Sequence, residues 1–224
     1  MKKPTPHGRR ALIYGNGPSV GAAVPGGWGK YDLIIGTNRC LVIKALQGAP
    51  FNVVVIRDGY RDLWYENRFG VLYHEQFWKP CPLWRVGSSV SRSNTHCDEF
   101  VSFADGWQAA GVRDHNRELL VMESASVVIQ AANWAWHYGA REFSLLGVDY
   151  TGGDCAEMIA PFAVSTGREG RYDKGPHSFI EPQFARMVAA IEAGGGSIVN
   201  LSPGTKLKAV PRGADAKDKR HSAP

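Results

Sequence analysis

Short apolar runs separated by polar turns dominate the first quarter of the chain and return near its end. Such runs lie at residues 11–14, 31–36 and 51–56, and again at 142–146 and 197–201. Aliphatic and β-branched residues predominate in them, which is typical of strands buried on both faces of a parallel sheet. We therefore predict a strand at each of these positions.

Two segments have the period of a helix. In residues 124–138 apolar side chains recur at helical spacing, Ser124 or Ser126 can cap the first turn, and Gly139 can end the helix. Residues 182–193 form the second such segment. The repeated order of strand, loop and helix predicts the α/β class: a single Rossmann-like, doubly wound, mostly parallel sheet with helices on both faces and a lid-like insertion.

One folded domain is predicted over residues 11–208, between a flexible N-terminus at 1–10 and a disordered basic tail at 209–224. Residues 59–117 are rich in aromatic side chains and weak in periodicity. We expect them to be a variable insertion that covers one sheet edge or forms an acceptor-side wall, although aromatics more often pack in a core. Residues 151–176, rich in glycine and charge, are predicted to be a lid.

The composition is that of a globular protein without a membrane span. The chain has 224 residues, and no apolar run approaches the roughly 20 residues that a transmembrane helix needs. Its first residues lack an apolar leader, which predicts a cytoplasmic protein. The net charge of +5 suits a small anionic partner such as a nucleotide and is no specific sign of nucleic acid. The four cysteines lack the spacing of a zinc motif, so we expect reduced, structural thiols.

Polar residues follow the predicted strands at the edge where doubly wound sheets bind their ligands. They are Asn16, Ser19, Asn38, Asp58 and Asp149. Because the carboxyl ends of parallel strands share one edge of a sheet, we expect these side chains to gather there.

The turn after the first strand, Gly15-Asn16-Gly17-Pro18-Ser19, is the most informative of these features. Its glycines let main-chain N–H groups approach an anion, and Asn16 and Ser19 add polar side chains. The turn lacks the third glycine of a dinucleotide fingerprint and the lysine of a Walker A loop. It is therefore either a plain tight turn or the first wall of a phosphate or nucleotide site.

Several motifs, in order and spacing, resemble the bacterial sialyltransferases of glycosyltransferase family 42 and the related DUF115 and Maf flagellin glycosyltransferase proteins. The resemblance covers residues 11–207. Its motifs are the turn at residues 15–19, Thr37-Asn38-Arg39, Ser124-Ala125-Ser126 at a helix start, Leu145-Leu146-Gly147-Val148-Asp149-Tyr150, His177-Ser178, and Asn200-Leu201-Ser202-Pro203-Gly204-Thr205-Lys206-Leu207.

The resemblance implies a nucleotide site made by several of these motifs. Asn16, Ser19 and Asn38 would bind the nucleotide. The helix start at Ser124 and Ser126 would bring N–H groups and a hydroxyl to its phosphate.

The same resemblance implies the remaining roles. Gly147, Asp149 and Tyr150 would line the base or ribose. His177 would act as the general base on an acceptor hydroxyl, a task suited to a group that titrates near neutrality. Family members have tyrosines that assist departure of the phosphate, and Tyr172 in the predicted lid is the candidate here.

These roles predict a nucleotide-sugar-dependent glycosyltransferase of the sialyltransferase-like type. It would need no metal and no obligatory cofactor, with CMP as a candidate donor nucleotide and a glycan or other hydroxyl as acceptor. Two alternatives stay open. An ATP- and magnesium-dependent pyrophosphokinase of the hydroxymethylpterin type would use Asp58 and Asp149 as metal ligands. A non-catalytic nucleotide-binding module is the other. The oligomeric state is also open, a homo-oligomer included.

Overall fold

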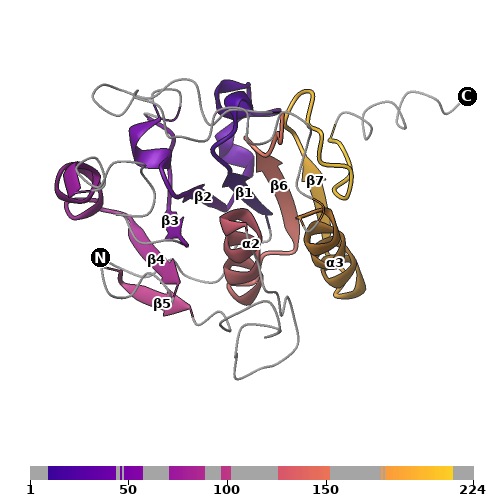
Figure 1. The fold of residues 1–224 in the computed structure, drawn as a ribbon. Coiled ribbons are helices and arrows are strands. Elements are labelled where there is room, and N and C mark those ends of the chain that lie inside the picture. Colours follow the sequence, from indigo (N-terminus) through magenta and orange to yellow (C-terminus); the bar gives the residue numbers. More distant parts are fainter. Residues whose placement is uncertain are drawn as a thin grey trace, which may run out of the picture.

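The computed structural model describes residues 10–43, 46, 48–57, 71–88, 97–101, 126–151, 178 and 180–213. They form one seven-stranded sheet in the order β5-β4-β3-β2-β1-β6-β7, and each neighbouring pair is parallel (Figure 1). The strands are β1 (Arg10–Tyr14), β2 (Leu33–Thr37), β3 (Val53–Ile56), β4 (Trp84–Ser88), β5 (Glu99–Val101), β6 (Glu142–Leu146) and β7 (Ser197–Asn200). The predicted α/β class and parallel sheet are confirmed.

The strands begin close to the predicted positions. Two of them start later than expected, because the preceding residues belong to turns. The Tyr31 N–H donates to Trp28 O and closes a 3₁₀ turn before β2, and the Phe51 N–H donates to Ala49 O before β3. Hydrophobicity placed these residues in the strands, whereas local hydrogen bonds hold them outside.

Alternating side chains of each central strand enter two separate cores. In β1, Ala11 and Ile13 join the cluster on one face of the sheet, and Leu12 and Tyr14 join the cluster on the other. All four are at most 1% exposed. The sheet is therefore buried on both faces, which is why the sequences of its central strands are continuous apolar runs.

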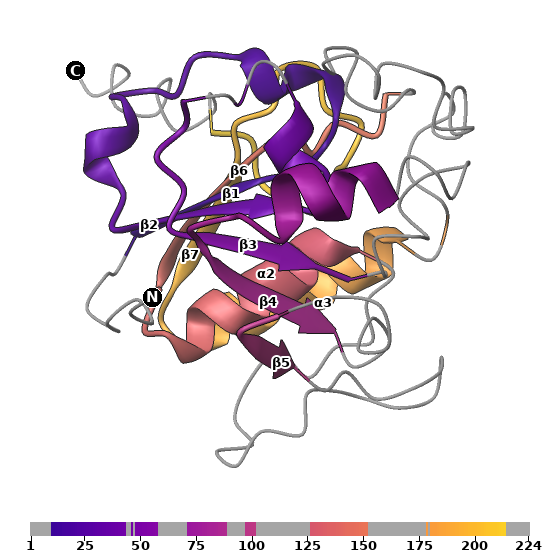
Figure 2. The ribbon, with the colours of Figure 1, turned by 90° about the vertical axis from the view of Figure 1, so that its left-hand side faces the viewer.

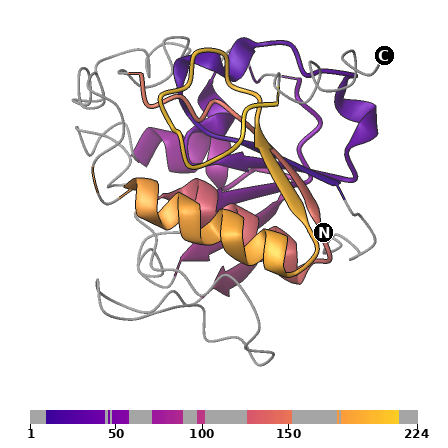
Figure 3. The same cartoon turned by 90° about the vertical axis from the view of Figure 1, so that its right-hand side faces the viewer.

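The two faces are covered by different kinds of element. Helices α2 (Val127–His137) and α3 (Ile180–Ala193) lie together on one face (Figures 2 and 3). In the described part of the chain, the other face carries the α-helical residues 71–73 together with short 3₁₀ and π-helical turns. The turns are η1 (Pro18–Gly21), η3 (Cys40–Val42) and the π-helical turn η5 (His74–Trp78). A further 3₁₀ turn, η2 (Trp28–Lys30), precedes β2.

Strands β4 and β5 and the turn η5 all lie in residues 59–117, the stretch predicted to be a variable insertion that covers one sheet edge or forms an acceptor-side wall. Arg85 of β4 and Asp98 hold this end of the sheet with a two-armed ion pair, Nε to Oδ2 at 2.9 Å and Nη2 to Oδ1 at 3.0 Å. Arg85 Nη1 also donates to the carbonyls of Trp78 and Lys79. Short strands with charged side chains lack the apolar run by which the others were predicted.

Two predicted boundaries also shift. Helix α2 begins at Val127, with Ser126 as its extended N-cap residue, and Ser124 lies outside the described residues. The tail predicted from residue 209 is wrong for residues 209–213, because Val210 is 1% exposed and the Gly213 N–H donates to Asn200 O at 2.9 Å. The packed region therefore extends at least to Gly213.

The strand order reverses direction between β1 and β6. From β1 the chain moves through β2, β3 and β4 to β5 at one edge, then returns to β6 beside β1 and ends with β7 at the other edge. The switch point of the sheet therefore lies between β1 and β6. A doubly wound sheet binds its ligand in the crevice at this switch point.

Candidate functional site

The loops that leave β1 and β6 touch each other through their backbones. The Gly15 N–H donates to Leu146 O at 2.7 Å, and the Gly17 N–H donates to Gly147 O at 2.8 Å. A Cβ at Gly15 would collide with the Gly147 carbonyl oxygen, and one at Gly17 with Asp149 Oδ2. The glycines therefore permit close contact between two loops. Both of their own N–H groups are paired in this contact, and the predicted approach of main-chain N–H groups of this turn to an anion stays a prediction.

Asn16 ties the β1 loop to the β2 loop. Its Nδ2 donates to Thr37 O at 3.0 Å and to Thr37 Oγ1 at 2.9 Å, while its Oδ1 accepts the Arg39 N–H at 3.1 Å. The Thr37 hydroxyl in turn donates to Tyr14 O. Both amide hydrogens of Asn16 are thus used inside the fold. Its structural role is to hold the β2 loop, and its predicted contact with nucleotide stays a prediction.

Asn38 occupies the corresponding position after β2. Its φ of +45° lies in the left-handed region, which asparagine adopts more readily than most residues. The Asn38 N–H donates to Val55 O at 2.9 Å, and its Oδ1 accepts the Arg57 N–H at 3.3 Å. Within the described residues its Nδ2 has no protein acceptor. The side-chain NH₂ group is therefore left to donate to a ligand.

Asp149 is the buried carboxylate of the site, with 3% of the residue exposed. Its Oδ2 accepts the Ser19 N–H at 3.2 Å, which joins η1 to the β6 loop, and in the described part of the chain its Oδ1 accepts no hydrogen bond. The Ser19 hydroxyl is also buried at this carboxylate. Burial raises the pKa of Asp149, and hydrogen bonding to Ser19 offsets only part of that rise. The pair thus offers an acceptor and a hydroxyl to a polar ligand.

The raised pKa of Asp149 makes a prediction about stability. The folded state favours the neutral carboxyl, so this group lowers the free energy of unfolding as pH rises from its ordinary value of 3.8 through the higher folded value. Asp149→Asn is expected to remove that decline, measured as the difference from the parent protein in urea unfolding across this pH range.

Asp98→Asn serves as a comparison, because Asp98 is expected to change the free energy of unfolding with pH in the opposite direction. Hydrogen bonds from Arg85 lower the pKa of Asp98, so its carboxylate contributes stability that is lost as pH falls through the folded pKa. An Asp149→Asn curve that stays parallel to the parent curve above pH 3.8 would contradict the assignment for Asp149.

Buried polar side chains after β7 hold the β6 loop from its other side. Asn200 Nδ2 and Thr205 Oγ1 donate to Val148 O at 2.9 and 2.8 Å, and Ser202 Oγ accepts the Val148 N–H at 2.8 Å. The Lys206 N–H donates to Asp149 O at 2.8 Å. The site prediction omitted these supporting residues, although polar residues directly after a strand were the signal that found the others.

Two further backbone features occur in the β6 loop. Gly147 has a φ of +75° and Tyr150 a φ of +52°. Tyr150 and Asn38 are the non-glycine residues with positive φ in the described part of the chain, and both follow strands at the carboxyl edge. Positive φ is unusual for a bulky residue and tends to occur at functional sites. The Tyr150 ring packs edge-on against Phe184 of α3, with 6.1 Å between centroids.

The N-terminus of α2 faces the same edge. Only residues 138–141 join the end of α2 to the start of β6, so the last turn of α2 lies at the amino edge of the sheet. The helix packs along β1, β2 and β3, and its first turn therefore lies at the carboxyl edge (Figure 2). Its N-cap residue Ser126 is 8% exposed. The partial positive charge of a helix N-terminus favours an anion.

The structure gathers most of the predicted nucleotide-binding residues at one edge. These are Gly15, Asn16, Gly17, Ser19, Asn38, Ser126, Gly147, Asp149 and Tyr150. The others lie outside the described residues, namely Asp58, Ser124, Tyr172, His177 and most of the predicted lid at 151–176. The described residues contain no group of three His, Cys, Asp or Glu side chains placed to hold a metal ion.

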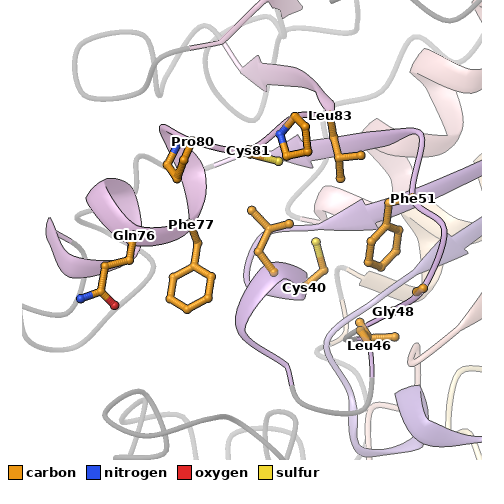
Figure 4. Close-up of a pocket in the computed structure, with 12 residues that line it drawn as sticks. Cys40, Leu46, Gly48, Phe51, Gln76, Phe77, Pro80, Cys81 and Leu83 are labelled. Carbon is orange, nitrogen blue, oxygen red and sulfur yellow. The ribbon is translucent and has the colours of Figure 1, made fainter.

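A separate groove on the face opposite α2 has a different chemistry (Figure 4). It has a volume of about 360 Å³ and is lined by apolar residues such as Phe51, Phe77 and Leu83, with the thiols of Cys40 and Cys81. Among the described residues of its lining, Gln76 provides the one side-chain amide and none is charged. These described residues therefore offer no cation to a phosphate. Cys40, Cys81 and Cys97 form no disulfide among the described residues, and Cys155 lies outside them.

The fold is that of a Rossmann-like α/β protein, and the predicted polar residues lie at the carboxyl edge of its sheet, near the switch point between β1 and β6. No protein-family model matches the chain, and no curated protein matches it in sequence. Among the described residues, no helix has the length and apolar character needed to cross a bilayer.

Two solved structures share the fold. The first is the MAf glycosyltransferase from Magnetospirillum magneticum AMB-1, with a TM-score of 0.53 and 16% identity over 91% of this chain and 33% of that chain. The second is the monofunctional alpha-2,3-sialyltransferase Cst-I from Campylobacter jejuni, with a TM-score of 0.50 and 13% identity over 91% of this chain and 80% of that one. The chain thus spans about a third of the first protein's length. At these identities the likeness establishes a common fold.

Proposed function

We propose that the chain is a nucleotide-sugar-dependent glycosyltransferase. One observation carries the proposal: the buried Ser19 hydroxyl and the Asp149 carboxylate lie beside the switch point, and the Asn38 amide follows β2 at the same edge, in a fold that two solved glycosyltransferases share. A nucleotide has the complementary groups, with ribose hydroxyls and base N–H groups for Asp149 and phosphate or carbonyl oxygens for Asn38.

The phosphate of the donor would lie toward the start of α2. Ser126 and the first-turn N–H groups of α2 favour negative charge at this end of the helix. We assign to these hydrogen-bond donors the task of offsetting the negative charge of the phosphate, so the proposed reaction uses no metal. CMP fits this assignment as the first nucleotide to test.

We further propose that transfer uses an acceptor hydroxyl activated by His177. The imidazole would take the hydroxyl proton while the acceptor oxygen attacks the anomeric carbon and the bond to the nucleotide phosphate breaks. Tyr172 would donate a hydrogen bond to the departing phosphate. These two assignments rest on the motif resemblance.

Thermal unfolding with CMP, CDP, UDP and ATP, each with and without magnesium, tests the donor class. A ligand that binds the native state stabilises it by about 2.7 kcal/mol at 100 times its Kd. We expect CMP to raise the Tm without magnesium.

Other results of these measurements would favour one of the alternative functions or exclude a nucleotide site. A response to ATP only in the presence of magnesium would favour the pyrophosphokinase. Binding of CMP without release of CMP from a CMP-sugar, whatever the acceptor, would favour a non-catalytic nucleotide-binding module. If no nucleotide raised the Tm, the nucleotide site itself would be wrong.

A further inference from the structure

Tyr73 lies in residues 59–117, which contain none of the motifs that resemble the sialyltransferase family, yet its hydroxyl bonds to a residue of the candidate site. The Tyr73 O–H donates to the Asn38 carbonyl oxygen at 2.6 Å. Tyr73 is 0% exposed and Asn38 is 9% exposed, so water competes little for this bond. The buried carbonyl of Asn38, a residue with positive φ, thus accepts its hydrogen bond from a side chain far along the chain.

The bond fills the last internal hydrogen-bonding position of Asn38 within the described residues. The N–H of Asn38 is held by Val55, its Oδ1 by the Arg57 N–H, and its carbonyl by Tyr73. These contacts fix both the backbone and the plane of the side-chain amide. Among these groups only the side-chain Nδ2 of Asn38 has no partner in the described part of the chain, and the hydrogen bonds of the N–H, the Oδ1 and the carbonyl set its direction.

The π-helical turn η5 braces the Tyr73 ring. Phe77 and Trp78 both stack on that ring, with centroid distances of 6.3 and 6.4 Å, and the Lys79 N–H closes the widened turn on His74 O at 2.8 Å. Such π-helical turns are rare and are often found at functional sites.

The far end of the turn is anchored to the sheet. Arg85 donates to the carbonyls of Trp78 and Lys79 while it pairs with Asp98. Burial also raises the pKa of Tyr73 well above its usual value, so the hydroxyl stays a donor at any physiological pH. A rigid path of contacts thus runs from β5 through β4 and η5 to the loop after β2.

We propose that Tyr73 is a positioning residue that aims the Asn38 side-chain amide at the bound nucleotide. The proposal rests on the proposed function, because it takes a nucleotide to be the ligand of Asn38. It assigns a part of the site to Tyr73 and the η5 turn, which hold Asn38 in place from the face of the sheet opposite α2.

Tyr73→Phe tests the proposal, because it keeps the ring and removes only the hydroxyl. We expect the Kd for CMP, measured by calorimetry well below the Tm, to rise about tenfold. A purely structural role would lower the Tm and leave the Kd of the folded protein unchanged.

Tyr31→Phe is the matched control. The Tyr31 hydroxyl is buried without a hydrogen-bond partner, so the same chemical change there should leave the Kd unchanged. In Asn38→Ala, addition of Tyr73→Phe should cause no further loss of affinity, because the amide that Tyr73 positions is gone.

The outcomes separate the two proposals. If the parent protein binds CMP and Tyr73→Phe binds it equally well, or if the losses in the double variant add, the role of Tyr73 is wrong while the nucleotide site stands. If the parent protein binds none of CMP, CDP, UDP and ATP, the proposed function fails and the role of Tyr73 fails with it.

Discussion

Replacing His177 by alanine is expected to slow glycosyl transfer by about 100- to 10,000-fold, the range typical for loss of a general base, while the affinity for nucleotide stays unchanged. The imidazole would act on the acceptor hydroxyl and not on the nucleotide. Its removal should therefore lower the rate of the chemical step and leave the binding of CMP intact.

The measurement does not require a known acceptor. Water can take the acceptor's place, so release of CMP from a CMP-sugar reports the chemical step. His137→Ala is the control, since His137 is exposed at the end of α2 that points away from the carboxyl edge. Parent-like turnover in His177→Ala would remove His177 from the catalytic residues, and loss of CMP binding would make it a nucleotide ligand.

Gly147→Ala is expected to lower the free energy of unfolding by about 2–5 kcal/mol. An alanine in the left-handed region costs about 1–2 kcal/mol, and insertion of a methyl group into a packed contact costs a further 1–3 kcal/mol or so. Gly147 meets both conditions, because its φ is +75° and a Cβ there would collide with Val20 Cγ1 and lie 3.1 Å from Gly15 O. Urea unfolding measures the loss.

Gly195→Ala separates the two contributions. Gly195 has a φ of +77°, but a Cβ there would meet no atom within 4 Å. This variant should therefore lose only the backbone contribution of about 1–2 kcal/mol. The excess loss in Gly147→Ala measures how closely the β1 and β6 loops approach. Equal losses in the two variants would mean that these loops separate freely, and the crevice would then not depend on their contact.

If the Gly147 contact shapes the crevice, its substitution should also weaken nucleotide binding. The alanine would displace Val20, which belongs to η1 together with Ser19, and Ser19 donates to Asp149. Calorimetry with CMP below the unfolding transition should show a higher Kd for Gly147→Ala and an unchanged Kd for Gly195→Ala.

The elements that could be predicted are those whose own sequence carries the signal for their structure. The central strands and both α-helices were predictable because each carries its own signal, a short apolar run or a helical stripe with a glycine stop. The edge strands β4 and β5 were not, because they are short, carry charged residues and are stabilised by the Arg85–Asp98 pair between segments. That pair depends on partners that no local pattern identifies.

The sequence by itself determined that polar residues follow the buried strands and that glycines flank Asn16. The parallel sheet then brings those residues to one edge, which made the location of the candidate site predictable. The role of each residue was not predictable from its type. From the sequence, Gly15 and Gly17 were predicted to shape a turn that binds an anion. In the structure their own N–H groups donate to carbonyls at the end of β6 and in the loop that follows it.

Only the tertiary structure decided which polar groups are left for a ligand. Asn16 has both amide hydrogens bonded within the fold, whereas Asn38, a similar residue in a similar loop, keeps its Nδ2 unpaired in the described part of the chain. The Tyr73 contact with Asn38 joins residues 35 positions apart. A hydrogen bond is satisfied by whichever donor and acceptor the packed chain brings within about 3 Å, and that choice belongs to the whole fold.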